Sequence, residues 1–254
     1  MARAAVLGRL SWLEATVVDT VAETARVRTV VVHVPGWRRH LPGQHVDVRL
    51  TADDGYQAQR SYSIASPPAE ERVAITVERI DDGEVSPYLV DELRPGDRFE
   101  LRGPIGGWFV WDVELGGPLM LVAGGSGVVP LAAIIRHRVS TGSDVPLRLL
   151  CSSRSFPDVI YRDELERLAG AVEGVDVAHT LTRSRPPEWT GYSRRVDDAM
   201  LAEVAWPADE RPLAYVCGPT RFVEAVADGL LALGYEGARV RTERFGPTGG
   251  GDGR

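Results

Sequence analysis

The spacing of apolar residues changes near residue 112, and this change limits what the chain can fold into. Before it, short segments rich in β-branched residues alternate with Pro-Gly and Asp-Gly pairs, at residues 13–17, 27–34, 46–50 and 73–77. Short strands separated by such turns are typical of a small antiparallel β-barrel. One helix is expected to interrupt the barrel at residues 86–93, because Pro87 suits the first helical position.

After residue 118, short apolar runs alternate with segments of helical periodicity. The runs cover residues 119–123, 147–151, 175–181, 213–217 and 238–242, and the helical segments cover 128–139, 160–169, 196–204 and 220–233. This alternation predicts a parallel sheet with helices on both faces, an α/β domain. We therefore expect a β-barrel domain over residues 7–112, an α/β domain over residues 118–246 and a flexible Gly-rich tail over residues 247–254.

Charge and composition exclude several classes of protein. A net charge of −7 disfavours nucleic-acid binding. Two cysteines are too few for a disulfide framework or an iron–sulfur cluster, and the spacing of the histidines indicates no metal site. The chain contains no Lys, which excludes Schiff-base catalysis and a Walker A motif. No segment is long and apolar enough for a signal peptide or a membrane span, so a cytoplasmic protein is expected.

Two motifs in the first half suit an anionic, planar ligand. Residues 60–63, Arg-Ser-Tyr-Ser, combine a cation for phosphate, an aromatic face and hydroxyl groups, although such residues are more often ordinary cross-strand pairs. Residues 83–86, Gly-Glu-Val-Ser, place Ser86 at the start of the expected helix. Free backbone N–H groups there suit a pyrophosphate, but an ordinary helix cap explains the same pattern.

Two further motifs follow expected strands in the second half. Residues 124–127, Gly-Gly-Ser-Gly, open a helix, and three glycines in four residues favour a phosphate site over a plain turn. Residues 217–219, Cys-Gly-Pro, also stand between a strand and a helix. Cys217 either faces a ligand crevice at the carboxyl edge of the sheet or is a small buried apolar residue.

In this order, the four motifs resemble those of the ferredoxin–NADP⁺ reductase superfamily, which joins an FAD-binding barrel to a nucleotide-binding α/β domain. The resemblance implies that Arg60 pairs with the FAD pyrophosphate, that Tyr62 stacks on the flavin and that Ser63 hydrogen-bonds near flavin N5. It also implies that Val85 and Ser86 offer N–H groups to the phosphates. The other residues expected at FAD are Ser61, Thr76, Val77, Glu78, Arg79, Glu84, Ser126 and Phe245, whose ring would cover the flavin.

For the pyridine nucleotide, the resemblance implies that Gly124, Gly125, Ser126 and Gly127 hold the pyrophosphate. Cys217, with Gly218 and Pro219, would lie beside the nicotinamide, and the residues expected to serve hydride transfer are Ser63, Cys217 and Glu243. NADPH is favoured over NADH by a group of cationic and hydroxyl side chains: Ser153, Arg154, Thr182, Arg183 and Arg195. NADH stays possible, because surface Arg is common in a chain without Lys.

The expected function is that of an FAD-dependent oxidoreductase. It would take hydride from NAD(P)H onto flavin N5 and pass electrons to a separate acceptor such as ferredoxin, flavodoxin or an oxygenase component. Two alternatives stay open. One is a reductase of free flavin or another small molecule, and the other is a flavin-binding accessory subunit without turnover of its own. No metal site, nucleic-acid partner or membrane insertion is expected.

Overall fold

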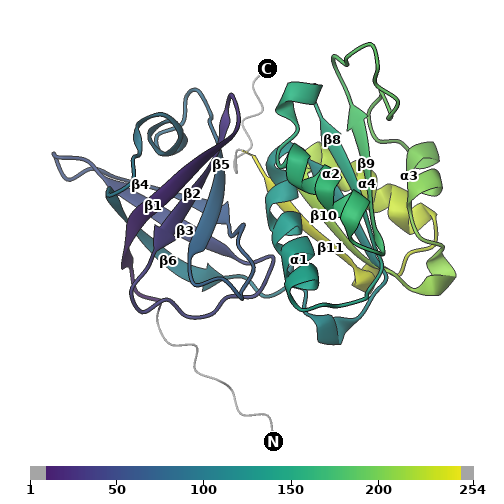
Figure 1. Cartoon of the computed structure of the whole chain (residues 1–254), viewed down its shortest axis with the longest axis horizontal. Coiled ribbons are helices and arrows are strands. Elements are labelled where there is room, and N and C mark those ends of the chain that lie inside the picture. The colour runs from purple at the N-terminus through teal and green to yellow at the C-terminus, as the bar shows by residue number, and fades with distance from the viewer. Residues whose placement is uncertain (1–9, 247–254) are drawn as a thin grey trace, which may run out of the picture.

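A computed structural model describes residues 10–246, which form two sheets lying side by side (Figure 1). The first sheet is antiparallel, with the strand order β4-β3-β6-β1-β2-β5. Its strands are β1 (Leu13–Thr24), β2 (Val27–His33), β3 (His45–Thr51), β4 (Gln57–Ser63), β5 (Val73–Glu78) and β6 (Arg98–Ile105).

Strand β1 bends this sheet into a barrel. Its first residues pair with β6 and the rest pair with β2, with register shifts after Val17 and after Ala22. Such irregularities bend and twist a strand. A bridge between Ile64 and Ile75 then joins the end of β4 to β5, the two edge strands. The barrel encloses its own apolar core, in which Ile64 and Ile75 are fully buried.

The helix expected at residues 86–93 covers residues 86–92 in the structure, so this prediction is confirmed to within one residue. Its last part is a wide turn, Tyr88–Glu92, closed by the Leu93 N–H, which donates to the Tyr88 carbonyl five residues earlier. Leu93 is already extended, and Pro95 disfavours the helical conformation at the residue before it. The helix therefore cannot lengthen at its C-terminal end.

The second sheet is parallel, with the strand order β11-β10-β7-β8-β9. Its strands are β7 (Leu119–Gly124), β8 (Leu147–Ser153), β9 (Val175–Leu181), β10 (Leu213–Pro219) and β11 (Val240–Phe245). Its helices are α1 (Val128–Ser140), α2 (Arg162–Ala171), α3 (Asp198–Val204) and α4 (Thr220–Ala232). Short helical turns occupy Val113–Leu115, Gly125–Gly127, Phe156–Asp158, Ala208–Glu210 and Gly237–Arg239.

Helices cover both faces of this sheet, as the sequence predicts. Leu119 and Leu121 of β7 pack with α1 and α2, whereas Met120 and Val122 pack with α3 and α4. A strand buried on both faces reads as a continuous apolar run, which is why β7 shows no polar alternation. The antiparallel barrel followed by a parallel α/β sheet confirms the expected fold class.

The two domains share one apolar core at their junction. Val27 and Ala74 of the barrel belong to the same cluster of buried side chains as Val128 of α1. Phe109, in the connection, packs its ring edge-to-face against Tyr215 of β10, with centroids 5.3 Å apart. None of the helices among residues 10–246 has the length and apolarity needed to cross a membrane. The expected start of the barrel domain at residue 7 and the tail at 247–254 lie outside the described residues.

Candidate functional site

The two glycine motifs of the α/β domain pack directly against each other. A Cβ added to Gly127 would overlap the carbonyl group of Cys217, and a Cβ added to Gly124 or Gly218 would press on the ring of Phe222. The ends of β7 and β10 can therefore approach this closely only with glycine at these positions. Gly125 has a φ of +56° and open space at its Cβ position, at the entrance to α1, where backbone N–H groups favour an anion.

A cluster of titratable side chains joins the two domains beside these motifs. Cys217 in β10 lies opposite Glu243 in β11. Glu243 reaches the barrel, where its Oε1 is 3.8 Å from Nδ1 of His45 in β3. His45 in turn lies opposite Ser63 in β4. The three residues expected to serve hydride transfer therefore gather around His45, which the sequence reasoning missed, although His45 follows directly on a Pro-Gly-Gln turn.

Burial opposes ionisation of the side chains in this cluster. Burial raises the pKa of Glu243 to about 7 and lowers the pKa of His45. The pKa of the Cys217 thiol is raised well above its ordinary value, first by burial and then by the charge of Glu243, so the thiol is not a nucleophile. Glu243 Oε2 is buried and has no hydrogen-bond partner among the described residues. A polar but uncharged ring such as a nicotinamide or a flavin fits this arrangement, because it can satisfy that oxygen without adding charge.

The Arg-Ser-Tyr-Ser strand presents its side chains alternately to two sides. Tyr62 is half-buried and packs on the barrel core. Arg60 is exposed, with Nη2 3.1 Å from Glu84 Oε2. Ser61 belongs to the other side, where its hydroxyl donates to Asp47 Oδ1 at 2.6 Å. Arg60 and Tyr62 are therefore available to one ligand, and Ser61 supports the strand from the opposite side.

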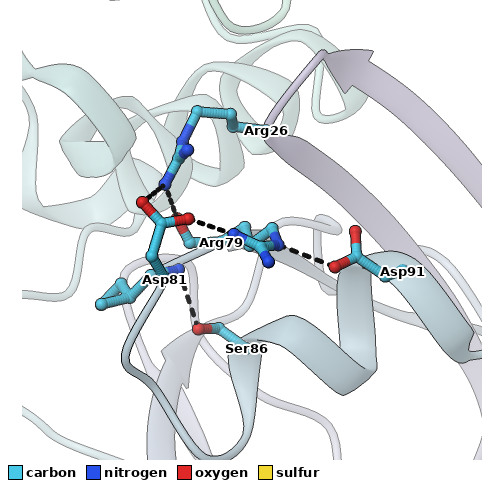
Figure 2. A network of polar contacts seen from close by, with 6 residues as sticks. Arg26, Arg79, Asp81, Ser86 and Asp91 are labelled. Carbon is cyan, nitrogen blue, oxygen red and sulfur yellow. Dashed lines mark hydrogen bonds and ion pairs between the residues drawn. The ribbon is translucent and has the colours of Figure 1, made fainter.

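The loop after β5 is held by a polar network (Figure 2). Arg79 Nε donates to Asp91 at 2.7 Å, and the same guanidinium contacts Asp81. Arg26 donates to the Arg79 carbonyl at 2.9 Å and pairs with Asp81 at 3.1 Å. Ser86 accepts the Ile80 N–H at 3.0 Å. The network fixes the loop that carries Glu84 and the buried Val85, so the phosphate-binding segment expected there is preformed.

Four residues expected at FAD form contacts within the barrel core or across the domain boundary. Val77 is fully buried in the barrel core. The Thr76 hydroxyl contacts Tyr161, which precedes α2. Glu78 accepts a hydrogen bond from the Ser126 hydroxyl at 2.7 Å. The sequence patterns gave no sign that Thr76, Glu78 and Ser126 join the two domains.

Four of the residues expected to select NADPH lie at the carboxyl edge of β8 and β9: Ser153, Arg154, Thr182 and Arg183. The Thr182 hydroxyl donates to the Ser153 carbonyl at 3.2 Å, and the Arg183 N–H donates to the Arg154 carbonyl at 2.9 Å. Arg154, Arg183 and Arg195 are exposed. Backbone contacts thus bring the main chains of two exposed cationic residues next to each other at the sheet edge where α/β proteins bind nucleotides.

Phe245 is half-buried, packs on the core shared by the two domains and lies opposite Pro219 in the β10–β11 register. It therefore adjoins the Cys-Gly-Pro motif. Within residues 10–246, no three His, Cys, Asp or Glu side chains are placed to bind a metal ion.

Known proteins contain the same two domains. Residues 14–110 match the oxidoreductase FAD-binding domain family, and residues 121–228 match the oxidoreductase NAD-binding domain family. The chain is 34% identical over 209 residues to the glycine betaine monooxygenase reductase subunit of Pseudomonas aeruginosa, covering 82% of this chain and 56% of that protein. It is 35% identical over 211 residues to ferredoxin–NADP reductase B of Sorangium cellulosum, covering 80% and 84%.

Solved structures agree with the domain arrangement. The flavohaem-like FAD/NAD-binding domain of a Vibrio cholerae nitric oxide dioxygenase superposes with a TM-score of 0.83 at 25% identity, covering 92% of this chain and 99% of that one. A cytochrome P450 reductase from Amycolatopsis superposes with a TM-score of 0.80 at 26% identity, covering 94% and 71%. The chain therefore belongs to the ferredoxin–NADP⁺ reductase family of oxidoreductases, with an FAD-binding barrel followed by an NAD-binding α/β domain.

Proposed function

We propose that this protein takes hydride from NAD(P)H onto FAD and passes the electrons to a separate protein, an iron–sulfur protein or the oxygenase component of a two-part enzyme. The observation that carries the proposal is the cluster of Glu243 and Cys217 from one domain with His45 and Ser63 from the other. The choice of acceptor is supported by relatives named as reductase subunits of monooxygenases, of which the chain spans 56–65% of the length.

FAD, when bound, supplies the chemistry of accepting hydride and releasing electrons. The protein supplies orientation. Arg60 neutralises the cofactor diphosphate, Tyr62 supports the ring, and Ser63 offers a hydroxyl at the domain junction. Cys217 gives a small apolar contact, and Glu243 gives a hydrogen-bonding carboxyl group whose pKa burial raises to about 7.

NADPH is the preferred coenzyme in this proposal, because Arg154 and Arg183 are exposed and held next to each other by backbone hydrogen bonds. A guanidinium group recognises the 2′-phosphate of NADPH, which NADH lacks. Replacing both residues with Ser is expected to raise the KM for NADPH about ten-fold or more, while the KM for NADH changes less than two-fold.

The deciding experiment is an anaerobic absorbance titration of the FAD-loaded protein with NADPH and then with NADH. Bleaching of the flavin bands by NADPH supports the reductase function. A yellow protein that neither coenzyme reduces would instead be a flavin-binding accessory subunit. Subsequent assays with a small ferredoxin and with free FMN separate the two remaining functions, because fast reduction of free FMN alone would favour a small-molecule reductase.

A further inference from the structure

A chain of buried hydroxyl groups crosses the boundary between the two domains. Thr29 Oγ1 donates to Glu23 Oε1 at 2.6 Å and is 2.7 Å from Thr76 Oγ1. Thr76 Oγ1 in turn contacts the Tyr161 hydroxyl. Because each hydroxyl has one proton, donation by Thr29 to Glu23 leaves Thr76 to donate to Thr29 and Tyr161 to donate to Thr76. The chain therefore has one direction, from the α/β domain into the barrel.

Arg136 of α1 supports the same contact from the α/β side. Its guanidinium lies 4.5 Å from the centroid of the Tyr161 ring and forms two hydrogen bonds with Glu164, at 2.8 and 2.6 Å. The remaining nitrogen, Nη1, donates to the Ala65 carbonyl of the barrel at 2.7 Å. Arg136 thus holds the Tyr161 ring in place and crosses the boundary itself.

The backbone of Tyr161 also has an unusual conformation at this contact. Its φ of +58° lies in the left-handed region, which residues other than glycine rarely adopt. The residue ends the segment before α2 and is 4% exposed, with its hydroxyl on Thr76 of β5. The structure maintains an unfavourable backbone conformation at the point where the side chain reaches the other domain.

The apolar contacts at the domain junction define the orientation of the two domains less sharply than hydrogen bonds do. Phe109, Val27, Ala74 and Val128 contribute burial, which is not directional. Hydrogen bonds are directional, so the hydroxyl chain and Arg136 limit rotation of one domain against the other. The Ser126–Glu78 hydrogen bond also crosses the boundary, but Ser126 belongs to the glycine motif expected to hold the coenzyme.

We propose that Tyr161 is a positioning residue for hydride transfer, which fixes the angle between the domains and thereby the distance between the two cofactors. The proposal rests on the proposed function, because hydride must pass from a ligand of one domain to a ligand of the other. A displacement of about 1 Å is enough to slow such a step strongly. Tyr161 touches neither the glycine motifs nor the Glu243 cluster in any hydrogen bond of the described chain, and its hydroxyl contacts Thr76, a residue expected at FAD, so its proposed effect on hydride transfer is through domain orientation.

The first test compares Tyr161→Phe with Tyr235→Phe, a matched control. Tyr235 is also buried, and its hydroxyl donates to the Trp206 carbonyl at 3.0 Å within the α/β domain. Both variants lose one buried hydroxyl, so both are expected to lose some thermal stability. With saturating NADPH in a stopped-flow instrument, the flavin of Tyr161→Phe is expected to be reduced at least about 10-fold more slowly than that of the wild type. The KM for NADPH, measured in steady state, is expected to stay unchanged. Tyr235→Phe is expected to keep the wild-type rate.

A second pair of variants tests the chain at its far end. Thr29→Val removes the acceptor of the Thr76 hydroxyl. It is expected to slow flavin reduction, as Tyr161→Phe does, but by a smaller factor. Thr29→Ser keeps the hydroxyl and is expected to restore the wild-type rate. Equal rates in the two Thr29 variants would contradict a role for the hydroxyl chain.

The orientation itself can be measured in the apoprotein. The two native cysteines, Cys151 and Cys217, are buried, so spin labels can be directed to Ala69→Cys in the barrel and Ala202→Cys in α3, both exposed sites. The distance distribution between the labels is expected to broaden with Tyr161→Phe and not with Tyr235→Phe. A wild-type width or a wild-type rate in Tyr161→Phe overturns the proposal. Failure of NADPH and NADH to reduce the wild-type flavin would overturn the proposed function alone, since the label distances would still report the orientation.

Discussion

At the scale of single residues, Glu243 links the site to the pH dependence of stability. Its pKa is raised from 4.5 to about 7 by burial, so its stabilising contribution is complete below about pH 4.5 and is lost as the pH rises through about 7. The loss is on the order of 3 kcal/mol. In the apoprotein, Glu243→Gln is expected to flatten the fall in Tm between pH 5 and pH 8. Glu224→Gln, at an exposed position of α4, is the control, and an unchanged slope in Glu243→Gln would contradict the assignment.

A second residue-scale effect concerns Arg60, which the structure pairs with Glu84 at 3.1 Å. Both side chains are exposed, so the pair is weak, but it competes with a phosphate for the guanidinium. Glu84→Gln is expected to tighten FAD binding by the apoprotein about three-fold at low salt and less at high salt. Tyr56→Phe removes only the hydroxyl that donates to Glu84 and should change the affinity for FAD less than Glu84→Gln does. Weaker FAD binding by Glu84→Gln would mean that the carboxylate itself contacts the cofactor.

At the scale of elements, the glycine motifs join β7 to β10. Gly127→Ala would push a methyl group into the Cys217 carbonyl, a backbone group that cannot move without shifting β10. A loss of roughly 2–4 kcal/mol in the free energy of unfolding is expected, with weaker coenzyme binding. Gly170→Ala in α2 is the matched control, because an added Cβ there meets no atom within 4 Å. It is expected to stabilise by about 0.5–1 kcal/mol. Denaturant titrations measure both, and equal effects would contradict the packing argument.

The elements themselves could be predicted largely from local patterns. The continuous apolar run of β7 is visible in the sequence because the strand is buried on both faces, and the helical periodicity of α1 and α4 is visible because each helix buries one face. The helix at residues 198–204 starts two residues later than expected, because the Asp197 side chain caps it by accepting the Met200 N–H. The helix expected at residues 86–93 is found at residues 86–92, but periodicity gave no sign that its last turn closes over five residues rather than four.

The candidate site was predictable only in part, because long-range contacts leave no periodic signal. The glycine motifs and Cys217 stand at strand ends, where topology alone brings them together. His45 and Tyr161 come from segments far apart in sequence from their partners, Glu243 and Thr76. The roles of Glu78 and Ser126 at the domain boundary depend on how two separately patterned domains dock, which the apolar spacing of neither domain encodes.

At the scale of the whole molecule, the shared core predicts that the two domains unfold together. Residues of the barrel and of α1 belong to one buried cluster, so disrupting either domain exposes part of the other. Ile75→Ala affects a fully buried residue of the barrel core, at a cost of roughly 2–5 kcal/mol.

The test follows the helices by circular dichroism, because α1 to α4 all lie in the α/β domain. With Ile75→Ala, the helical signal of the apoprotein is expected to melt roughly 5–10 °C lower, in a single transition. Leu230→Ala, in the core beneath α4, should lower the temperature of the same transition directly. It shows how large a shift a core mutation within the α/β domain produces. If the barrel mutation leaves the helical transition at the wild-type temperature, the domains unfold independently. Domain orientation would then depend on the hydroxyl chain and Arg136 rather than on a common core.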